Sequence, residues 1–284
     1  MSSFAVYTLN NEQTDLFYFN KDGNLDLEAV LEKIVEEYET PYEGTKIIGN
    51  GFLNPCIIEK EVDLNELCTT NNYKFNSNDN KFKVIQATIT GSGSLGYYNE
   101  AHFQDGKVIS QRKQHTFFSN ADILITESGL LVVYFEMFAA EKIKSQIRTL
   151  FEALGFDIST FRFTPQLLKN VREKCNWTEI KLERIDNEQD STKKVSYEVD
   201  ITDKDSESLI DRIYKDKGFI IQISFHLSYN LKQGGNAKKG AYGVKLYHKE
   251  HRGSLNNNEF ENDNAAMKEF IIYLTNYLVE LSKL

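Results

Sequence analysis

The sequence has few cysteines, no long apolar segment and no internal repeat. Its 284 residues include three scattered cysteines, Cys56, Cys68 and Cys175, and none belongs to a CxxC pair. This pattern excludes a dense disulfide framework and favours a reducing compartment, so we expect a cytoplasmic protein. No apolar run approaches the ~18 residues of a membrane span, and the first residues lack the basic and apolar segments of a targeting signal. We therefore expect no membrane partner.

The charge of the chain is unevenly distributed. The net charge is −9, which argues against a protein that coats nucleic acid with its whole surface. Residues 1–80 contain 15 acidic and 5 basic residues, whereas residues 217–252 contain 7 basic residues and a single acidic one. A local basic patch in the C-terminal half is therefore the main indication of a partner.

Hydrophobic periodicity predicts an α+β fold with two lobes. An acidic, β-rich mixed lobe is expected over residues 1–138, with one amphipathic helix from Leu27 to Tyr38. Residues 139–284 are expected to form an α/β lobe. This second lobe would contain a helical hairpin over residues 143–175, a long antiparallel β-hairpin over residues 219–253 and an apolar C-terminal helix over residues 264–283.

The strongest local pattern is that of the β-hairpin. Apolar and polar residues alternate over residues 219–230 and again over residues 242–249, with glycine-rich turn signals between the two runs. A register that pairs Leu227 with Leu246 would keep the two apolar faces together. One face of the hairpin would then be core, and the other would be polar and cationic.

The polar face of this hairpin is the candidate nucleic-acid interface. Cationic side chains can contact phosphates, and aromatic or imidazole rings can stack on exposed bases. The candidate residues are Lys238, Lys239, Lys245, Tyr247, Lys249, Arg252 and His226. The alternative is a solvated hairpin whose lysines protect an edge strand from aggregation.

Other motifs give no evidence of a cofactor, metal or catalytic site. Residues 91–96 match GxGxxG, but the chain then runs into an Asp105-Gly106 hairpin and leaves no room for a phosphate-binding helix. We expect an ordinary inter-strand loop at residues 91–96. His248 and His251 are three residues apart, so a strand would direct them to opposite faces, and no nucleophile motif is present. The main hypothesis is therefore a protein that acts by binding, without a cofactor.

Two other functions stay open. Glu179-Ile180-Lys181 matches half of a divalent-metal nuclease site, with Asp157 upstream, although a predicted helix separates the two parts. The C-terminal helix is apolar on several faces, which indicates either burial on two sides or use in a homo-oligomer or protein complex. In the second case the chain would be a protein-only assembly factor. The lack of a metabolic signature suggests, as speculation, a component of phage defence or of a mobile-element system.

Overall fold

A computed structural model describes residues 2–10, 18–20, 23–37, 52–53, 57–63, 81–135, 144–185, 192–200, 209–214, 217–233, 236–260 and 263–284. The chain divides into two compact units, and both are discontinuous in sequence. The first unit comprises Met1–Thr8, Lys60–Lys83 and Thr160–Leu284, and the second comprises Leu9–Glu59 and Val84–Ser159. The expected division after residue 138 differs from this one, because the N-terminal strand and the C-terminal half belong to the same unit.

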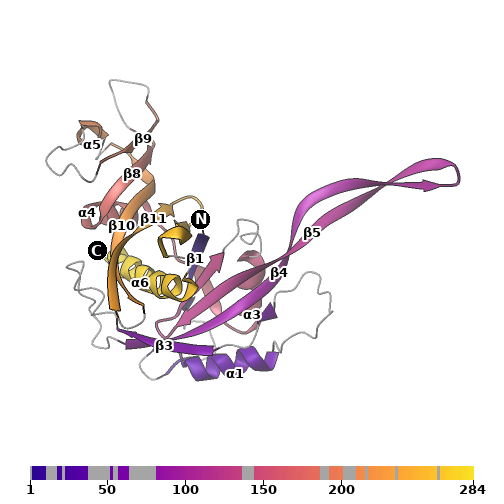
Figure 1. Ribbon diagram of the computed structural model, residues 1–284, viewed down its shortest axis with the longest axis horizontal. Coiled ribbons are helices and arrows are strands. Elements are labelled where there is room, and N and C mark those ends of the chain that lie inside the picture. Colours follow the sequence, from indigo (N-terminus) through magenta and orange to yellow (C-terminus); the bar gives the residue numbers. More distant parts are fainter. Residues whose placement is uncertain are drawn as a thin grey trace. The chain divides into compact units, whose positions relative to one another are not determined.

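The first unit contains an antiparallel sheet in the strand order β1–β12–β11–β10–β8–β9. Its strands are β1 (Ser2–Asn10, whose last residues belong to the second unit), β8 (Asn176–Glu183), β9 (Lys194–Glu198), β10 (Phe219–Gln233), β11 (Asn236–Tyr247) and β12 (Arg252–Leu255). Strands β10 and β11 form the long antiparallel hairpin that the sequence predicts (Figure 1).

Helices α4 (Pro165–Lys174) and α6 (Asn264–Ser282) pack on the apolar face of this sheet, together with η4 (Asn257–Phe260). The first turn of α4 is capped by its own sequence. Thr164 Oγ1 accepts a hydrogen bond from the Leu167 N–H at 3.1 Å, and proline occupies the first helical position. Asn170 of α4 donates its side-chain amide to Leu281 O of α6 at 2.8 Å. Rings from β10, β11, η4 and α6 form the core, namely those of Tyr229, Tyr242, Phe260, Phe270 and Tyr273.

The C-terminal helix α6 is buried on more than one side. Phe270, Ile271, Tyr273 and Leu274, four residues that span more than one face of the helix, are all fully buried. Of the two expectations for this helix, burial on two sides is the one that the structure shows. Its apolar residues are used within the chain.

Short helix α5 (Leu209–Tyr214) is held by a buried charge pair. Both oxygens of Asp211 lie 2.7 Å from Arg172 Nη2 of α4, and the Tyr197 hydroxyl of β9 donates to Asp211 at 2.6 Å. Because the Asp211 carboxylate has both an ionic and a hydrogen-bonding partner, it fixes the position of α5. Removal of either partner would leave a buried charge without full compensation.

The N-terminal strand joins the first unit through a very close approach. Gly253 of β12 and Phe4 of β1 are Cα partners, and a Cβ on Gly253 would lie 2.0 Å from Phe4 Cζ. Only glycine leaves room for the Phe4 ring at this position. Within the first unit, the chain's first strand is thus paired with a strand from its C-terminal half.

The second unit contains an antiparallel sheet in the order β2–β4–β5–β6. Its strands are β2 (Phe52–Leu53), β4 (Lys81–Gln104, whose first residues belong to the first unit), β5 (Lys107–Thr126) and β6 (Leu130–Phe135); β3 (Ile57–Asp63) pairs with β4, and β7 (Asp157–Thr160) pairs with β1. All six residues of β6 are buried, so this strand is the centre of the unit's core.

Two helices belong to the second unit, α1 (Leu27–Glu37) and α3 (Lys144–Ala153). Asp26 caps α1, because its Oδ1 accepts hydrogen bonds from the N–H groups of Glu28 and Ala29 at 3.1 and 3.2 Å. Both helices direct an apolar stripe into the core, which includes Val30, Ile34, Ile147 and Phe151. The amphipathic helix predicted from Leu27 is confirmed.

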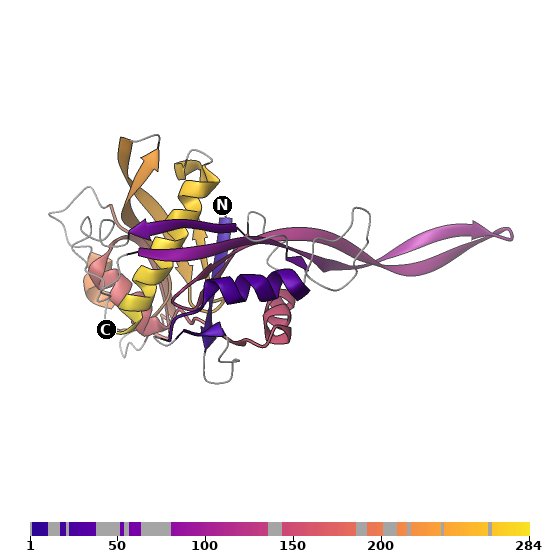
Figure 2. The same ribbon diagram turned by 90° about the horizontal axis from the view of Figure 1, so that it is seen from below.

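Strands β4 and β5 continue far beyond the core as a two-stranded ribbon. We call residues 97–114 the outer ribbon; its ladder runs from the pair Tyr97 and Gln114 to the pair Gln104 and Lys107. Figures 1 and 2 show it extending away from the other described elements of the second unit, with no described strand along either edge. The Asp105-Gly106 turn that the sequence predicts closes it.

The structure confirms the α+β fold and corrects several local predictions. Residues 91–96, expected to be a loop, lie within β4, where the register shifts between Ser94 and Tyr97 and Gly96 adopts φ +106°. A glycine bulge therefore bends a continuous strand at the point where a loop was predicted. The helices expected to form a hairpin, α3 and α4, are separated in the chain by strand β7 and belong to different units.

No helix in the described part of the chain has the length and apolar character required to cross a membrane.

Candidate functional site

The β10–β11 hairpin has a different register from the predicted one. Leu227 pairs with Tyr242, not with Leu246, which pairs with Ile223. The difference is four residues, an even number, so every side chain keeps the face that the alternating pattern assigned to it. Phe225 and Leu227 are buried on the core face, and His226 is half-buried on the polar face.

The length of the connection explains the correct register. The ladder extends to the pair Gln233 and Asn236, so only residues 234 and 235, both glycines, lie between the paired strands. The predicted register would have left a longer unpaired segment between the strands. Two-residue connections that contain glycine are the favoured ones in hairpins, and the additional pairs satisfy more backbone groups.

A row of polar residues crosses the sheet on the face opposite the core. Ser224 of β10 pairs with Glu179 of β8 on one side and with Lys245 of β11 on the other, and Lys245 pairs in turn with Ser254 of β12. Side chains at paired positions on adjacent strands point to the same face. The sheet therefore brings together residues that are up to 75 positions apart in the sequence.

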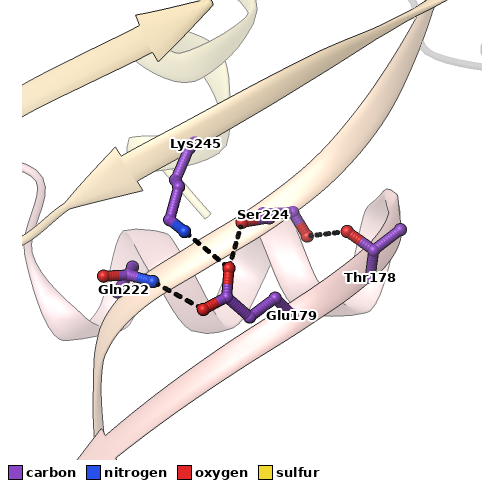
Figure 3. Close-up of polar contacts among 5 residues, drawn as sticks. All are labelled: Thr178, Glu179, Gln222, Ser224 and Lys245. Carbon is purple, nitrogen blue, oxygen red and sulfur yellow. Dashed lines mark hydrogen bonds and ion pairs between the residues drawn. The ribbon is translucent and has the colours of Figure 1, made fainter. Parts of the chain in front are cut away.

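Glu179 is the centre of this row (Figure 3). Its carboxylate accepts hydrogen bonds from Gln222 Nε2 at 2.9 Å, Ser224 Oγ at 3.0 Å and Lys245 Nζ at 2.6 Å. Partial burial raises the pKa of Glu179, but the hydrogen bonds from Lys245 and Ser224 outweigh this effect and hold the pKa below its usual value. Lys245, predicted to contact phosphate, is thus neutralised by a carboxylate that the hairpin sequence does not contain.

Glu183 forms a second ion-paired group on the same strand. Its carboxylate lies 2.8 Å from Lys194 Nζ of β9 and 2.5 Å from Lys249 Nζ. Hydrogen bonds from Lys194 and Lys249 lower the pKa of Glu183 to about 2. Lys249, which the sequence analysis included in the second alternating run, lies in the turn after β11. The strand ends at Tyr247, which pairs with Gln222.

Arg252, another of the candidate contact residues, lies on strand β12. It pairs with Tyr247 across the ladder, and its guanidinium carbon lies 4.6 Å from the centre of the Tyr247 ring. Its Nε donates to Glu250 at 2.8 Å and its Nη1 donates to Ser3 Oγ at 3.1 Å. Two more of the predicted contact residues, Arg252 and Tyr247, are therefore engaged with each other, and Arg252 also has a carboxylate partner.

The end of the hairpin differs from its base. The register pairs Lys239 with Asn230 and Lys238 with Leu231, and the following pair contains Lys232. These three lysines fall within three successive pairs of the ladder. The sequence between Phe219 and Lys249 contains no aspartate or glutamate. The sequence analysis did not include Lys232 among the candidate residues. The absence of acidic residues over the whole hairpin could have indicated it.

A shallow depression lies on the polar face beside His226. His226 pairs with Gly243 across the ladder, and a depression of about 170 Å³ lies beside this pair. The surrounding walls include Thr178, Ser224, Lys245 and Ser254. Ser254, which the sequence did not single out, is 4% exposed, and its hydroxyl has no hydrogen-bond partner among the described residues.

The histidines and acidic residues in the described ranges do not gather into a metal site. His248 Nδ1 lies 2.7 Å from Phe163 O, and no group of three His, Cys, Asp or Glu residues that can hold a metal occurs in the described part of the chain. For the nuclease hypothesis, Asp157 belongs to the second unit, and the residue paired with Glu179 on β9 is Glu198. The hypothesis remains a prediction, which requires Mg²⁺- or Mn²⁺-dependent cleavage that Glu179→Ala abolishes.

The sequence matches no protein-family model, and a search of curated proteins finds no significant match. The assignment of a function therefore depends on the chemistry of the described residues.

Proposed function

We propose that the chain binds single-stranded nucleic acid through the end of the β10–β11 hairpin. The observation that carries this proposal is that Lys232, Lys238 and Lys239 fall within three successive ladder pairs of a segment without acidic residues. Strand alternation places positions 232 and 239 on the face of His226 and position 238 on the other face. Lysine side chains attract phosphate oxygens, and such contacts are the main source of affinity for a polyanion. The cytoplasmic location expected from the cysteine content is compatible with this function.

The hairpin end is a better phosphate site than the hairpin base. Lys245 and Lys249 each have a glutamate partner at hydrogen-bond distance. A phosphate that approached either lysine would compete with that glutamate and would be repelled by it. The initial hypothesis of a broad cationic face thus narrows to the three lysines at the end of the ladder.

The test is the salt dependence of oligonucleotide binding. We expect Lys232→Gln/Lys238→Gln/Lys239→Gln to weaken binding and to lower the slope of log K against log salt by about 2, because each phosphate contact on a single strand contributes about 0.7. The measurement is fluorescence anisotropy of a short labelled oligonucleotide over a series of salt concentrations.

A matched control removes three lysines from other places. Lys194 and Lys249 are paired with Glu183, and Lys107 lies at the tip of the outer ribbon. Their combined substitution by glutamine changes the net charge by the same amount. If the two triple variants bind with the same affinity and the same salt slope, nucleic-acid binding by the hairpin end is rejected.

The outer ribbon supports a second candidate function, self-association. Phe103 is 77% exposed and Val108 is 69% exposed, and Tyr97, Tyr98 and Ile109 are also exposed. A two-stranded ribbon is marginally stable by itself in water, so burial of these side chains against another surface would stabilise it. Assembly was first expected through helix α6, whose apolar residues are buried within the chain.

Charge favours a second copy of this chain as the partner of the ribbon. The outer ribbon has three basic and two acidic residues, a net charge of +1, so the rest of the chain, with −9 in total, carries −10. The ribbon and the remainder of a second molecule are therefore of opposite sign. With only one excess positive charge, the ribbon is less suited to a nucleic-acid backbone.

Sedimentation equilibrium over a range of protein concentrations tests this second function. We expect the wild-type chain to form a dimer or larger oligomer, and Phe103→Ser/Val108→Ser to remain monomeric. The control variant is Thr160→Ser/Thr178→Ser, with two conservative substitutions outside the ribbon. It should associate as the wild type does. A wild-type chain that is monomeric at the highest attainable concentration would refute self-association. Binding of nucleic acid by the ribbon would show that its partner is not a second copy of the chain.

A further inference from the structure

The two faces of the outer ribbon differ in their chemistry. Because side chains alternate along a strand, the odd positions of β4 share one face with the even positions of β5. We call this the apolar face. It contains the two most exposed hydrophobic side chains of the ribbon, and no acidic residue. From the base of the ribbon to its tip, its ladder pairs are Tyr97 with Gln114, Asn99 with Arg112, Ala101 with Ser110 and Phe103 with Val108.

The opposite face of the ribbon is occupied by an ion-paired group. The Glu100 carboxylate lies 2.9 Å from His102 Nε2 and also forms an ion pair with Lys113. The hydrophobic side chains on this ion-paired face, Tyr98 and Ile109, are less exposed than those on the apolar face. Covering paired charges costs desolvation energy, whereas covering exposed apolar groups is favourable. The apolar face is therefore the one that a partner would cover.

The sizes of the side chains along the apolar face are self-complementary. If a second apolar face packs against it in the antiparallel direction, the first ladder pair opposes the fourth and the second opposes the third. Tyr97 then lies against Phe103 of the second copy, and Arg112 lies against Ser110 of the second copy. Long side chains thus occupy the space that small ones leave, and ring meets ring.

A parallel arrangement of two apolar faces would fit less well. Each ladder pair would oppose its own counterpart, so the small residues Ala101 and Ser110 would face small residues and leave a gap. Both Arg112 side chains would also share one layer, where their charges would repel each other. In the antiparallel arrangement each guanidinium keeps its place over the Tyr97 ring of its own chain, 4.3 Å from the ring centre.

Charge and area indicate a second copy and a reversible contact. An antiparallel arrangement directs each ribbon towards the rest of the other molecule, which is acidic, whereas the ribbon has a small excess of positive charge. The side chains of Tyr97, Phe103 and Val108 from both copies would bury roughly 600–900 Å² in total, at about 100–150 Å² each. This area is below the ~1,200 Å² at which stable complexes begin, so we expect a weak dimer that dissociates on dilution.

We propose that two copies of this chain associate through their outer ribbons, packed apolar face against apolar face in antiparallel directions. The inference rests on self-association, the second of the proposed functions, and assigns the contact to one face of the ribbon and to one orientation. Because two-stranded ribbons twist, the two ribbons coil about each other over the four layers. The ion-paired face stays in water.

The first test compares matched substitutions on the two faces by sedimentation equilibrium. Phe103→Ser/Val108→Ser removes a ring and a branched side chain from the apolar face, and Tyr98→Ser/Ile109→Ser removes the same kinds of group from the ion-paired face. We expect the first variant to raise the dissociation constant of the dimer by about tenfold or more, and the second to change it by less than about twofold. Circular dichroism of both variants checks that the core remains folded.

The second test uses charge at Ser110 to determine the orientation. In the antiparallel arrangement Ser110 faces Arg112 of the second copy, so Ser110→Glu adds two ion pairs to the dimer and Ser110→Lys adds two repulsions. We expect the dissociation constant to fall about threefold for Ser110→Glu and to rise about threefold for Ser110→Lys. Gln111→Glu and Gln111→Lys, on the ion-paired face, make the same charge changes and should have smaller effects.

The outcomes separate the face and the orientation from self-association itself. A monomeric wild-type chain would overturn the inference and the second proposed function together. A dimer that Tyr98→Ser/Ile109→Ser weakens as much as Phe103→Ser/Val108→Ser does, or more, would overturn the assigned face and leave self-association intact. A dimer that Ser110→Glu weakens or leaves unchanged would overturn the antiparallel orientation. Binding of a labelled oligonucleotide that is lost in Phe103→Ser/Val108→Ser would show that nucleic acid covers the apolar face, and would also overturn the inference.

Discussion

The two long hairpins of this chain have the same kind of backbone ladder and opposite side-chain environments. In the β10–β11 hairpin, Phe225 is 1% exposed and lies in the core under one face of the sheet. In the outer ribbon of β4 and β5, Phe103 is 77% exposed. Both hairpins have regular antiparallel pairing over many residues. Pairing alone therefore does not determine whether a hairpin is part of a folded core.

The two environments determine where each hairpin is available to a partner. One face of β10–β11 is covered by α6, and the charged residues at its base are paired with glutamates. Its end carries Lys232, Lys238 and Lys239. The outer ribbon is exposed on both faces. Nucleic-acid binding is accordingly proposed for the first hairpin and assembly for the second.

The matched phenylalanines, Phe225 and Phe103, should differ strongly in their contribution to stability. Phe225→Ala should lower the free energy of unfolding of the first unit by about 3–5 kcal/mol, because it removes a buried ring and leaves a cavity. Phe103→Ala should change stability by no more than about 0.5 kcal/mol, as is usual for an exposed position. Urea unfolding followed by circular dichroism measures both. A loss of more than 2 kcal/mol in Phe103→Ala, measured at a concentration where the chain is monomeric, would show that the ribbon is packed within its own molecule.

A buried and an exposed thiol should differ in their rate of alkylation. Burial raises the pKa of Cys175 to about 11 despite its contact with the Tyr277 hydroxyl at 3.5 Å. At pH 8 an exposed cysteine has a far larger thiolate fraction, so alkylation of Cys175 should be slower by roughly two orders of magnitude. The comparison uses Val108→Cys in the outer ribbon as the exposed thiol.

Both thiols are measured after Cys56 and Cys68 have been replaced by serine. One protein then retains Cys175 as its single thiol, and in the other Cys175 is also replaced by serine and Val108→Cys is introduced. Iodoacetamide modification is followed by mass spectrometry under native conditions. Similar rates for Cys175 and for the introduced cysteine would contradict the burial difference between the two regions.

Hydrophobic periodicity predicted the helices and strands well. It failed for features that depend on which residues of distant strands pair. The strands β10 and β11 and the helix α6 follow from alternation and from helical spacing. The hairpin register does not, because pairing Leu227 with Leu246 or with Tyr242 keeps the apolar faces together equally well. The length of the connection decides between them. The continuity of β4 through residues 91–96 was also missed, since a glycine bulge and a loop have similar sequences.

The candidate site was predicted in part. His226 and Lys245 were correctly placed on the polar face. Glu179 was considered only as a nuclease residue, because the sequence does not show that β8 lies beside β10. That strand order, which places strands distant in sequence next to each other, supplies the carboxylates that neutralise Lys245 and Lys249. Charge counted along a segment overestimates the charge of a face when neighbouring strands contribute the opposite sign.

The smallest expected effect is the pH dependence of stability in the two regions. Lys194 and Lys249 hold the pKa of Glu183 at about 2, below its ordinary value of 4.5. A carboxyl group with a lowered pKa in the folded state stabilises the protein above its ordinary pKa and loses this contribution as the pH falls through the folded value. The stability that Glu183 contributes should therefore be lost between pH 4.5 and about 2.

Glu100 in the outer ribbon provides the comparison. Its pKa is also lowered, by a hydrogen bond from Lys113, but its side chain is 36% exposed against 14% for Glu183. Glu183→Gln should flatten the decrease in melting temperature over this pH range relative to the wild type. Glu100→Gln, which changes the net charge equally, should leave the decrease almost unchanged, because the ribbon contributes little to the folded core. Equal flattening by both substitutions would show that general charge, and not the paired geometry around Glu183, determines the acid sensitivity.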